Sequence, residues 1–329
     1  MHVRPLFAAL LGALSVPARE ELTLTRTFAL EYELATTHFQ LTGSENGRSE
    51  EHQAPAVRRA ESELVEARDL CADAEDPLAR FERRYETVSS SFAYQGGGQE
   101  PSEEIVNAGL EGKTITFERA DEGEWTRTTD AEGVNPRQLE RLRADLSLGE
   151  FLPDEELAVG ASWELGYAPF ERLVGPLGPV GARARRRTMG GSSAGLELAP
   201  SCLVEPLWLL LAKAEGSATF TRVEAEEGAE LAALAEIEFR FEATHDGSKH
   251  LLRGREGEVE DEVTITWSGT GTLAWERTSG ALEIKLDGEL DLEEEFAVAF
   301  EGNGVQGELK GSLACSGPFD AEAREAREE

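Results

Sequence analysis

The chain has 329 residues, of which 40% are hydrophobic, and its 65 acidic residues outnumber 32 basic ones to give a formal net charge of −33. A chain of this length and hydrophobic content can bury a sizeable core, which excludes a disordered protein. Nucleic acids and anionic membrane surfaces are themselves negative, so the acidity argues against both as partners. We expect a solvated acidic exterior and no nucleic-acid partner.

The N-terminus has the pattern of an export signal. Arg4 precedes an apolar run from Leu6 to Val16, which is too short to span a bilayer. Small residues around Ala18 suit cleavage after that position. The sequence therefore predicts a signal peptide over 1–18, an exported protein (periplasmic or extracellular), and no membrane span after cleavage. The alternative is a buried N-terminal strand or helix.

The first predicted strand starts at Leu22 and alternates apolar and polar residues as far as Leu34. The phase slips by one residue at Thr36 and Thr37, which is the effect of a β-bulge. The segment from Arg58 to Arg68 has helix propensity but few apolar positions, so a helix there would be mostly exposed. The residues alone leave helix or strand open over 57–94.

The middle of the chain predicts a hairpin, a helix and a linker. Residues Thr114–Arg119 and 124–128 alternate around a turn. Asn135 and Pro136 suit the start of a helix that would extend through Leu146. Residues 175–200 combine glycine, proline and arginine, which is typical of a linker. After the linker, the apolar run 206–212 predicts a second short helix, either buried or acting as a lid, which Gly216 would end.

Three long alternating runs near the C-terminus give the strongest indication of fold. Their apolar tracks extend from Val263 to Trp275, from Leu282 to Phe300 with one interruption at Glu294, and from Val305 to Phe319. Period two over such lengths predicts antiparallel strands with one buried and one solvated face. Residues 231–241 predict a further strand of the same kind.

Turn residues fix a register for these strands. Asn303-Gly304 predicts a two-residue hairpin that pairs Val298 with Leu309 and brings Gly288 beside Phe319. A weaker hairpin at Ser279-Gly280 would pair Trp275 with Ile284. Glycines fall on the apolar tracks, where they allow a sheet to bend.

The predicted fold class is mainly β with a minor α component. Long bent antiparallel sheets would form half-barrel or sandwich-like lobes with one or two short packing helices. The predicted divisions are the signal peptide 1–18, an N-terminal β lobe 19–174, the linker 175–200, a C-terminal β lobe 201–320 and a charged tail 321–329. The alternative is a single continuous sheet.

Two stretches resemble a family of exported bacterial β-rich proteins that has no assigned activity. The first is Leu152-Pro153 followed by Val159-Gly160 and Ser162-Trp163, an LP-x5-VG-x-SW motif, and the second is the strand–turn–strand 269–282. The resemblance implies an envelope or secreted location and a long-stranded β fold, with strands rather than helix over 57–94. At the level of fold it is also similar to periplasmic lipoprotein carriers. Trp163 itself suits a core anchor at the start of a strand.

Chemical signatures are weak throughout. His245, Asp246 and His250 share one loop but lack further ordered ligands, so we expect an exposed turn and no metal site. Cys71, Cys202 and Cys315 allow one disulfide or three free thiols. A row of acids follows the polar side of the second long run, where Ca²⁺ could bind loosely: Glu283, Asp287, Glu289, Asp291, Glu293 and Glu295.

The sequence therefore predicts a non-enzymatic exported protein without a cofactor. Its concave sheet would bind a hydrophobic ligand, such as a lipid, or an envelope protein. The residues predicted to line that side are Trp267, Trp275, Leu286, Phe296 and Phe300. The alternative is an acidic structural or adhesive surface protein that binds Ca²⁺ weakly, and a hydrolase is a third and weaker reading.

Overall fold

The computed structural model describes residues 22–45, 48–53, 56–71, 79–96, 102–106, 109–120, 123–178, 205–225, 231–246, 257–276, 280–302 and 305–328. The predicted signal peptide lies outside these residues, and so does most of the predicted linker, including its arginines.

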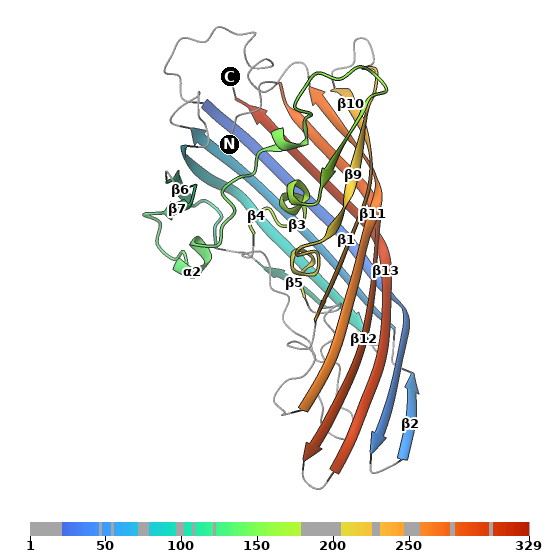
Figure 1. Ribbon diagram of the computed structural model, residues 1–329. Coiled ribbons are helices and arrows are strands. Elements are labelled where there is room, and N and C mark those ends of the chain that lie inside the picture. The colour runs from blue at the N-terminus through green and yellow to red at the C-terminus, as the bar shows by residue number, and fades with distance from the viewer. Residues whose placement is uncertain are drawn as a thin grey trace.

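The described residues form one antiparallel sheet of thirteen strands, which does not close into a barrel (Figure 1). The order along the sheet is β7-β6-β4-β3-β1-β13-β12-β11-β10-β9-β8, and β2 and β5 pair with β1 and β4. The strands are β1 (Leu22–Glu45), β2 (Arg48–Gln53), β3 (Val57–Cys71), β4 (Arg80–Gly96), β5 (Ser102–Val106), β6 (Thr114–Arg119), β7 (Trp125–Thr128), β8 (Ser162–Gly166), β9 (Glu215–Arg222), β10 (Leu231–Asp246), β11 (Gly257–Glu276), β12 (Leu282–Gly302) and β13 (Val305–Arg327).

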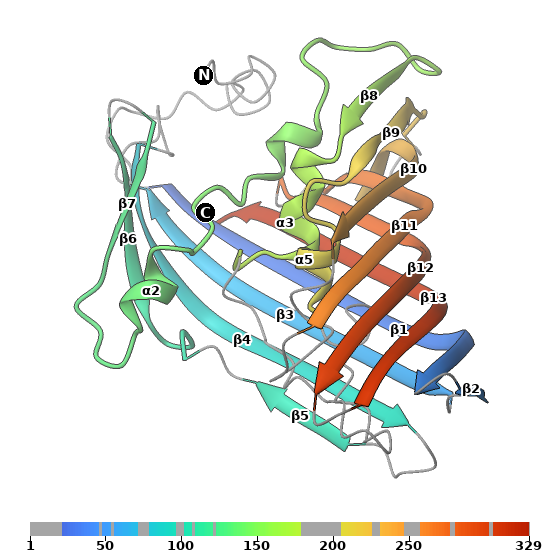
Figure 2. The same ribbon diagram turned by 60° about the horizontal axis from the view of Figure 1, so that its bottom comes forward.

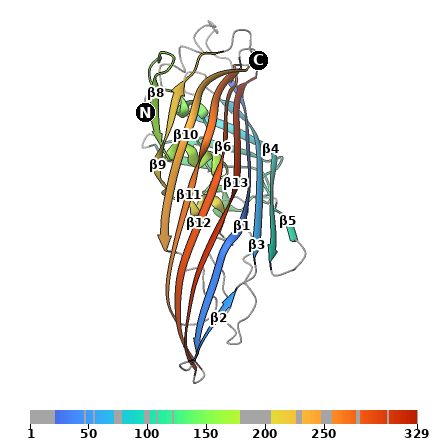
Figure 3. The same cartoon turned by 90° about the vertical axis from the view of Figure 1, so that its right-hand side faces the viewer.

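The sheet bends, and short helices lie on its concave side (Figure 2). These helices are α2 (Pro136–Leu139), η1 (Leu148–Phe151), η2 (Ala168–Phe170), α3 (Glu171–Val174) and α5 (Leu207–Leu210). A view onto the convex side shows the long strands β10 to β13 and β1 with the helices behind them (Figure 3). The predicted fold class, mainly β with long bent antiparallel strands and a few short packing helices, is confirmed.

The bulge predicted in the first strand is confirmed. The register of β1 against β13 shifts between Thr36 and His38, after which Phe39 takes the buried position. Between Leu22 and Leu34 the even-numbered residues face the concave side. After the shift the odd-numbered residues do so, and the strand therefore keeps its apolar track on one face over its whole length.

Residues 57–71 form a strand, so the helix propensity of this segment is misleading and the strand implied by the family resemblance is correct. Buried and more exposed residues alternate strictly along β3. The alternation is hard to read from the sequence because several of its inward residues are charged, among them Arg59, Glu61 and Asp69. Pairing on the inner face, described below, is what lets these charges take buried positions.

The predicted long helix after Asn135 is wrong in length. Asn135 caps the helix as expected, since its side chain accepts a hydrogen bond from the backbone N–H of Arg137, but the helix ends at Leu139. Beyond it Leu142, Leu146 and Leu148 are buried together with Ala144. Burial at every second residue belongs to an extended segment, so tertiary packing overrides the helical spacing of the leucines.

The second predicted helix is confirmed as a short buried turn of helix, although it ends earlier than expected. Helix α5 ends at Leu210, and Lys213 takes the positive φ of 65° that follows. Gly216 is not the helix cap but part of β9. Its positive φ of 121° lets the backbone approach the carbonyl of Arg240 on β10 closely.

The register of the long C-terminal strands is confirmed on one side and corrected on the other. Val298 pairs with Leu309, and Gly288 lies opposite Phe319, as predicted. Trp275 pairs with Leu282 rather than with Ile284. The connecting turn is thus two residues longer than predicted, and because the difference is even, every side chain keeps its predicted face.

Strands from both predicted lobes join in the same sheet. Strand β1 pairs with β13 along almost its whole length, and the residues predicted as a charged tail continue β13 to Arg327. The described residues therefore show the single continuous sheet that was the alternative to separate lobes.

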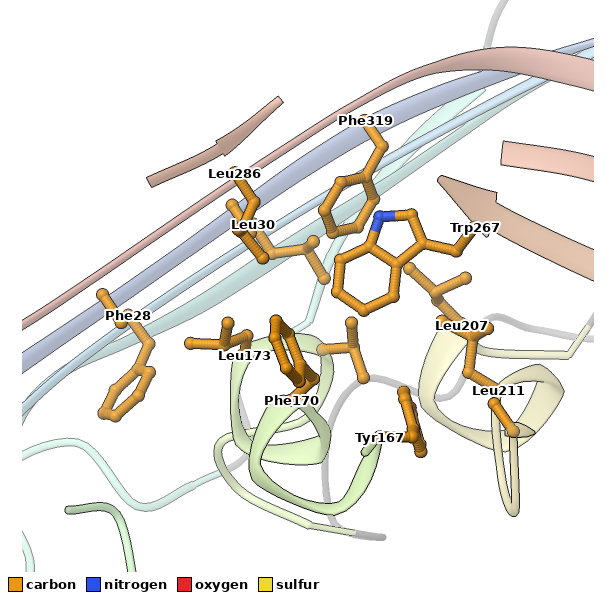
Figure 4. Close-up of a cluster of buried hydrophobic side chains, with 14 of the residues drawn as sticks. Phe28, Leu30, Tyr167, Phe170, Leu173, Leu207, Leu211, Trp267, Leu286 and Phe319 are labelled. Carbon is orange, nitrogen blue, oxygen red and sulfur yellow. The ribbon is translucent and has the colours of Figure 1, made fainter. Parts of the chain in front are cut away.

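The densest part of the core lies between the sheet and the helical cover, by which we mean η2, α3 and α5. Phe170 is fully buried, and its ring centre lies 4.9 Å from that of Phe241 and 6.1 Å from that of Trp267, which it meets edge-on. Leu173, Leu207 and Leu211 complete this contact from the helices (Figure 4). Helix α3 packs on β1 and β13, at the middle of the sheet.

Candidate functional site: the concave face

The residues predicted to bind a ligand divide between two parts of the concave face. Trp267 and Leu286 lie under the helical cover and are almost fully buried. Trp275 is half-buried near the turn at Gly280, and Phe296 lies on the other side of Trp267 along the sheet, toward the ends of β11 and β12. The backbone of Phe300 belongs to β12, but its side chain lies outside the described part.

Trp267 packs against protein on several sides. Its ring lies 4.8 Å from Phe239 and 4.8 Å from Phe319, in addition to its contact with Phe170. Gly269 and Gly288 face one another beside it, and the ring of Phe239 fits over Gly288, 3.2 Å from the position that a Cβ atom would take. This part of the concave face is a packed core.

Beyond the helices the apolar track continues toward the bottom of the sheet in Figure 1, along β1 and β11 to β13. We call this part the lower face. It consists of the inward residues Phe39, Val259, Asp261, Val263, Glu294, Phe296, Val298, Leu309 and Leu313. One of its two phenylalanines, Phe296, extends its ring over Gly311 on the paired strand, where a Cβ atom would overlap the ring. The ring therefore covers Gly311 on β13.

Three groups of buried charges lie on the concave face, and the first is balanced. We call it the arginine cluster: Arg26, Asp69, Arg83 and Glu325. Arg83 donates to both carboxylate oxygens of Asp69, each at 2.7 Å. Arg26 donates to Asp69 and, at 2.7 Å, to Glu325. Burial alone would lower the pKa of Arg26, but the carboxylates of Glu325 and Asp69 outweigh it and raise that pKa.

The arginine cluster also anchors the segment that follows α2. Arg83 donates to the backbone carbonyls of Arg143 at 2.8 Å and Ala144 at 2.9 Å. Its guanidinium lies 5.1 Å from the ring centre of Phe81 and 5.0 Å from that of Phe117. Every charge has an opposite partner, so this cluster holds the structure together and leaves no site for a ligand.

The second group lies elsewhere on β3, where Arg59 pairs with Glu61 and the carboxyl of Glu63 stays outside the ion pair. Arg59 donates to the hydroxyl of Tyr32 at 2.6 Å and to Glu61 at 3.0 Å, and Tyr32 donates to Glu61. Glu63, the next inward residue, is 6% exposed, and its Oε1 atom has no hydrogen-bond partner among the described residues. Burial and then the charge of Glu61 raise the pKa of Glu63 to about 8. Glu63 is therefore protonated at neutral pH.

The third group lies toward the ends of β11 and β12, and we call it the acid pair: Asp261 on β11 and Glu294 on β12. Both occupy apolar-track positions and are buried, with exposures of 7% and 1%. Asp261 lies opposite Phe296, and Glu294 opposite Val263, which makes the two acids diagonal neighbours. No donor among the described residues reaches either carboxylate oxygen of Asp261.

Asp261 keeps its proton at neutral pH. The two acids lie close enough for the charge of Glu294 to oppose ionisation of Asp261. Burial, then Glu294, then Asp246 raise the pKa of Asp261 to about 8. His245 lies opposite Val263 on β10 and is the nearest inward polar residue of that strand.

Sequence reasoning found only part of this arrangement. The interruption of the apolar track at Glu294 is visible in the sequence, and it is the signal that a polar group enters the inner face. Asp261 escapes notice because the predicted track starts after it, at Val263. Arg26, Arg59 and Glu63 escape notice because a lone charge in an alternating run cannot be assigned a partner before the strand order is known.

His245 and Asp246 belong to strand β10 and not to the exposed turn that we expected, and His250 lies outside the described residues. Within the described residues no group of three or more His, Cys, Asp or Glu side chains could hold a metal ion. Cys71 and Cys315 are buried free thiols, and Cys202 lies outside the described ranges. Five of the six acids predicted for the solvated side of β12 are exposed, whereas Glu283 is buried. Lys285 bridges Glu283 at 3.1 Å and Glu322 at 3.6 Å.

The convex face carries a shallow depression of about 860 Å³ near the ends of the long strands. Five outward side chains line it in one row across five paired strands: Gln40, Ser312, Glu295, Glu262 and Asp246. Lys310 is the basic residue at its border and pairs with Glu308 at 2.9 Å. The depression is acidic and open to solvent.

The resemblance motif is placed as expected in structural terms. Gly160 has a φ of 85° at the turn, and Trp163 begins β8. The indole of Trp163 stacks 5.0 Å from Phe220 and donates to the carbonyl of Phe151 at 3.2 Å. Trp163 therefore anchors the edge of the core.

Comparison of the sequence with known proteins gives no relative: no protein-family model matches the chain, and no curated protein matches it significantly. Among the described residues no helix is long and apolar enough to cross a membrane.

Proposed function

We propose that this protein is a non-enzymatic exported carrier that holds the apolar part of a ligand, such as a lipid, on the lower face. The proposal depends on one observation above the others. The apolar track of β1, β11, β12 and β13 continues well beyond the helical cover, which packs on β1 and β13 at the middle of the sheet.

The difference between the two parts of the concave face supports this role. Under the cover, aromatic side chains interlock with Phe170 and fill the core. On the lower face the ring of Phe296 lies over Gly311, and the track continues with the buried apolar residues Val298 and Leu309. Binding sites for small molecules are mostly apolar and concave, with a few polar groups that set orientation.

The test is to purify the mature protein and analyse co-purifying lipids by mass spectrometry. Displacement of the neutral probe N-phenyl-1-naphthylamine by dodecanol measures the same property in solution. We expect a bound lipid and a saturable probe signal. Replacing Val298, which is fully buried on the lower face, with Asp should abolish both. A lipid-free protein that does not bind the probe would end the carrier proposal.

A second candidate is an acidic structural or adhesive surface protein that binds Ca²⁺ weakly. It is favoured by the depression on the convex face, where Asp246, Glu262 and Glu295 share one row. Calorimetric titration with Ca²⁺ is the test. Binding that is weakened in Glu262→Gln would support this function, and absence of both heat and a shift in melting temperature would exclude it.

A further inference from the structure

Glu63 is a buried acid on the concave face whose hydrogen-bonding capacity the fold leaves unused. On the sheet it lies between Leu30 of β1 and Ser90 of β4, and its exposure is 6%. Its Oε1 atom is buried, and no donor among the described residues reaches it. A buried polar atom without a hydrogen bond lowers stability, so this oxygen marks a place where a bound molecule can supply the missing partner.

The charged groups next to Glu63 are paired with one another. Glu61, the preceding inward residue of β3, accepts hydrogen bonds from Arg59 at 3.0 Å and from the hydroxyl of Tyr32. Glu61 is the charged residue that acts on Glu63, and it opposes ionisation of the second carboxyl. Glu63 is therefore neutral, and a neutral carboxyl group carries one O–H donor and a carbonyl acceptor.

Apolar side chains lie around this carboxyl group and lead away from it. Val65 follows Glu63 on β3, and Val88 lies diagonally across on β4, both buried. From Leu30, opposite Glu63, the apolar track of β1 continues through buried Leu34 to Phe39, where the lower face begins. A ligand with its hydrocarbon part on the lower face can extend along β1 and end in a head group at Glu63.

The best complement to a neutral carboxyl group is a neutral head group with a donor and an acceptor side by side. A primary amide has both, since its N–H can donate to one oxygen of Glu63 while its carbonyl accepts from the O–H. A cationic head would require Glu63 to give up its proton. An anionic head would lie beside the charge of Glu61. Both alternatives are less favourable in a buried site.

We infer that the ligand of the concave face is a neutral amphiphile whose head group, a primary amide or a group with the same adjacent donor and acceptor, binds the carboxyl group of Glu63. This inference rests on the proposed carrier function and names the class of ligand.

The experiment compares three ligands with the same oleyl chain: oleamide, N,N-dimethyloleamide, which lacks the N–H donors, and oleylamine. Each displaces N-phenyl-1-naphthylamine from the full mature chain at pH 7, below the concentration at which it aggregates. We expect oleamide to bind at least about fivefold more tightly than either of the other two, which is the effect of one hydrogen bond.

Two substitutions of Glu63 separate hydrogen bonding from packing. Glu63→Gln keeps a donor and an acceptor in the same place and should keep the preference for oleamide. Glu63→Leu removes both and should abolish the preference, while the affinity for the naphthylamine probe stays the same. Replacement of a buried acid by an apolar residue of similar size is commonly neutral or stabilising, so Glu63→Leu should fold. Glu82→Leu is the matched control, because Glu82 is exposed on the opposite face of β4.

The pH dependence of oleamide binding is a second readout. Burial and the charge of Glu61 raise the pKa of Glu63 to about 8. Burial also raises the pKa of Tyr32, which faces this part of β3 from β1 and stays protonated, and Ser90 faces it from β4. The affinity for oleamide should fall above about pH 8 in the wild type and stay constant in Glu63→Gln.

The outcomes distinguish this inference from the carrier proposal. If the three ligands displace the probe with equal affinity, or oleylamine binds best, the head-group inference is wrong and the carrier remains. If the preference for oleamide persists in Glu63→Leu, Glu63 is not its site. If none of the ligands displaces the probe, the carrier proposal itself fails.

Discussion

The arginine cluster and the acid pair are two solutions to the same problem, a charge on the apolar side of a sheet. In the cluster, Asp69 receives three charge-assisted hydrogen bonds from Arg26 and Arg83, and Arg83 also binds backbone carbonyls and aromatic rings. In the acid pair, Asp261 meets another carboxyl, and no donor of the described residues reaches its oxygens. Both groups are buried, so the two aspartates differ in their hydrogen-bond partners and not in their exposure.

The largest effect should come from breaking the balanced cluster. Asp69→Asn leaves two buried guanidinium groups without their shared carboxylate, and removal of one partner from such a group typically costs about 3–5 kcal/mol. Denaturation by urea measures the loss of free energy of unfolding. Asp291→Asn, on the solvated face, should change it by less than about 0.5 kcal/mol. A small loss in Asp69→Asn would show that the cluster does not hold the sheet together.

The acid pair predicts a stability that falls as pH rises. The pKa of Asp261 is raised from 3.8 to about 8 in the folded protein, so between these values the folded state holds a proton that the unfolded state has lost. Stability is then highest below about pH 4 for this group, and it declines by up to about 1.4 kcal/mol per pH unit until pH reaches about 8.

Asp261→Asn should reduce this decline by roughly 3–4 kcal/mol between pH 5 and pH 8. Unfolding by urea at several pH values gives the slopes, with Asp291→Asn again as the control. Equal slopes in Asp261→Asn and the wild type would mean that Asp261 is not protonated in the folded state.

A smaller effect is expected from the wall beside the acid pair. Gly311→Ala places a methyl group where the ring of Phe296 lies, and overpacking of this kind costs about 1–2 kcal/mol. Gly166→Ala is the control, because no atom lies within 4 Å of its Cβ position. Melting temperatures of the two variants make the comparison. If both melt alike, the ring of Phe296 does not rest on Gly311.

The smallest effect should come from a charge pair on the surface. Arg58 and Glu33 form an ion pair in which both side chains are largely exposed, at 60% and 43%. Exposed pairs contribute little because water and salt screen them. Arg58→Ala should therefore change the free energy of unfolding by about 0.5 kcal/mol or less. A loss as large as that of Asp69→Asn would remove the distinction between buried and exposed pairs.

Much of the architecture could be predicted from the alternation of apolar and polar residues alone. The tracks of β1 and of β10 to β13 are apolar enough for alternation to be seen, and the slip at Thr36 marks the bulge. The longer turn before Leu282 shifts the pairing of β11 with β12 by two residues. Alternation cannot reveal this shift, because each side chain stays on the same face of the sheet. The leucines after Asn135 were wrongly predicted to form a helix. Their spacing fits a helix, but in the fold they pack in an extended segment.

The candidate site was harder to predict for a different physical reason. Recognition of Asp261 and Glu294 as neighbours needs the pairing of β11 with β12, which the sequence does not give. Strand β3 was obscured by the same feature, since Arg59 and Glu61 look solvated until Tyr32 is placed beside them. Buried charges become interpretable only when the strand order is known.

The pairing of β1 with β13 at the centre of the sheet has a kinetic consequence. Thr25 donates a hydrogen bond to the carbonyl of Ala326, 301 residues further along the chain. Contacts between such distant residues close large loops, and proteins dominated by them fold slowly. The two halves of the sheet can join only after nearly all of the polypeptide has been synthesised, so the newly made chain stays open until its last strand emerges.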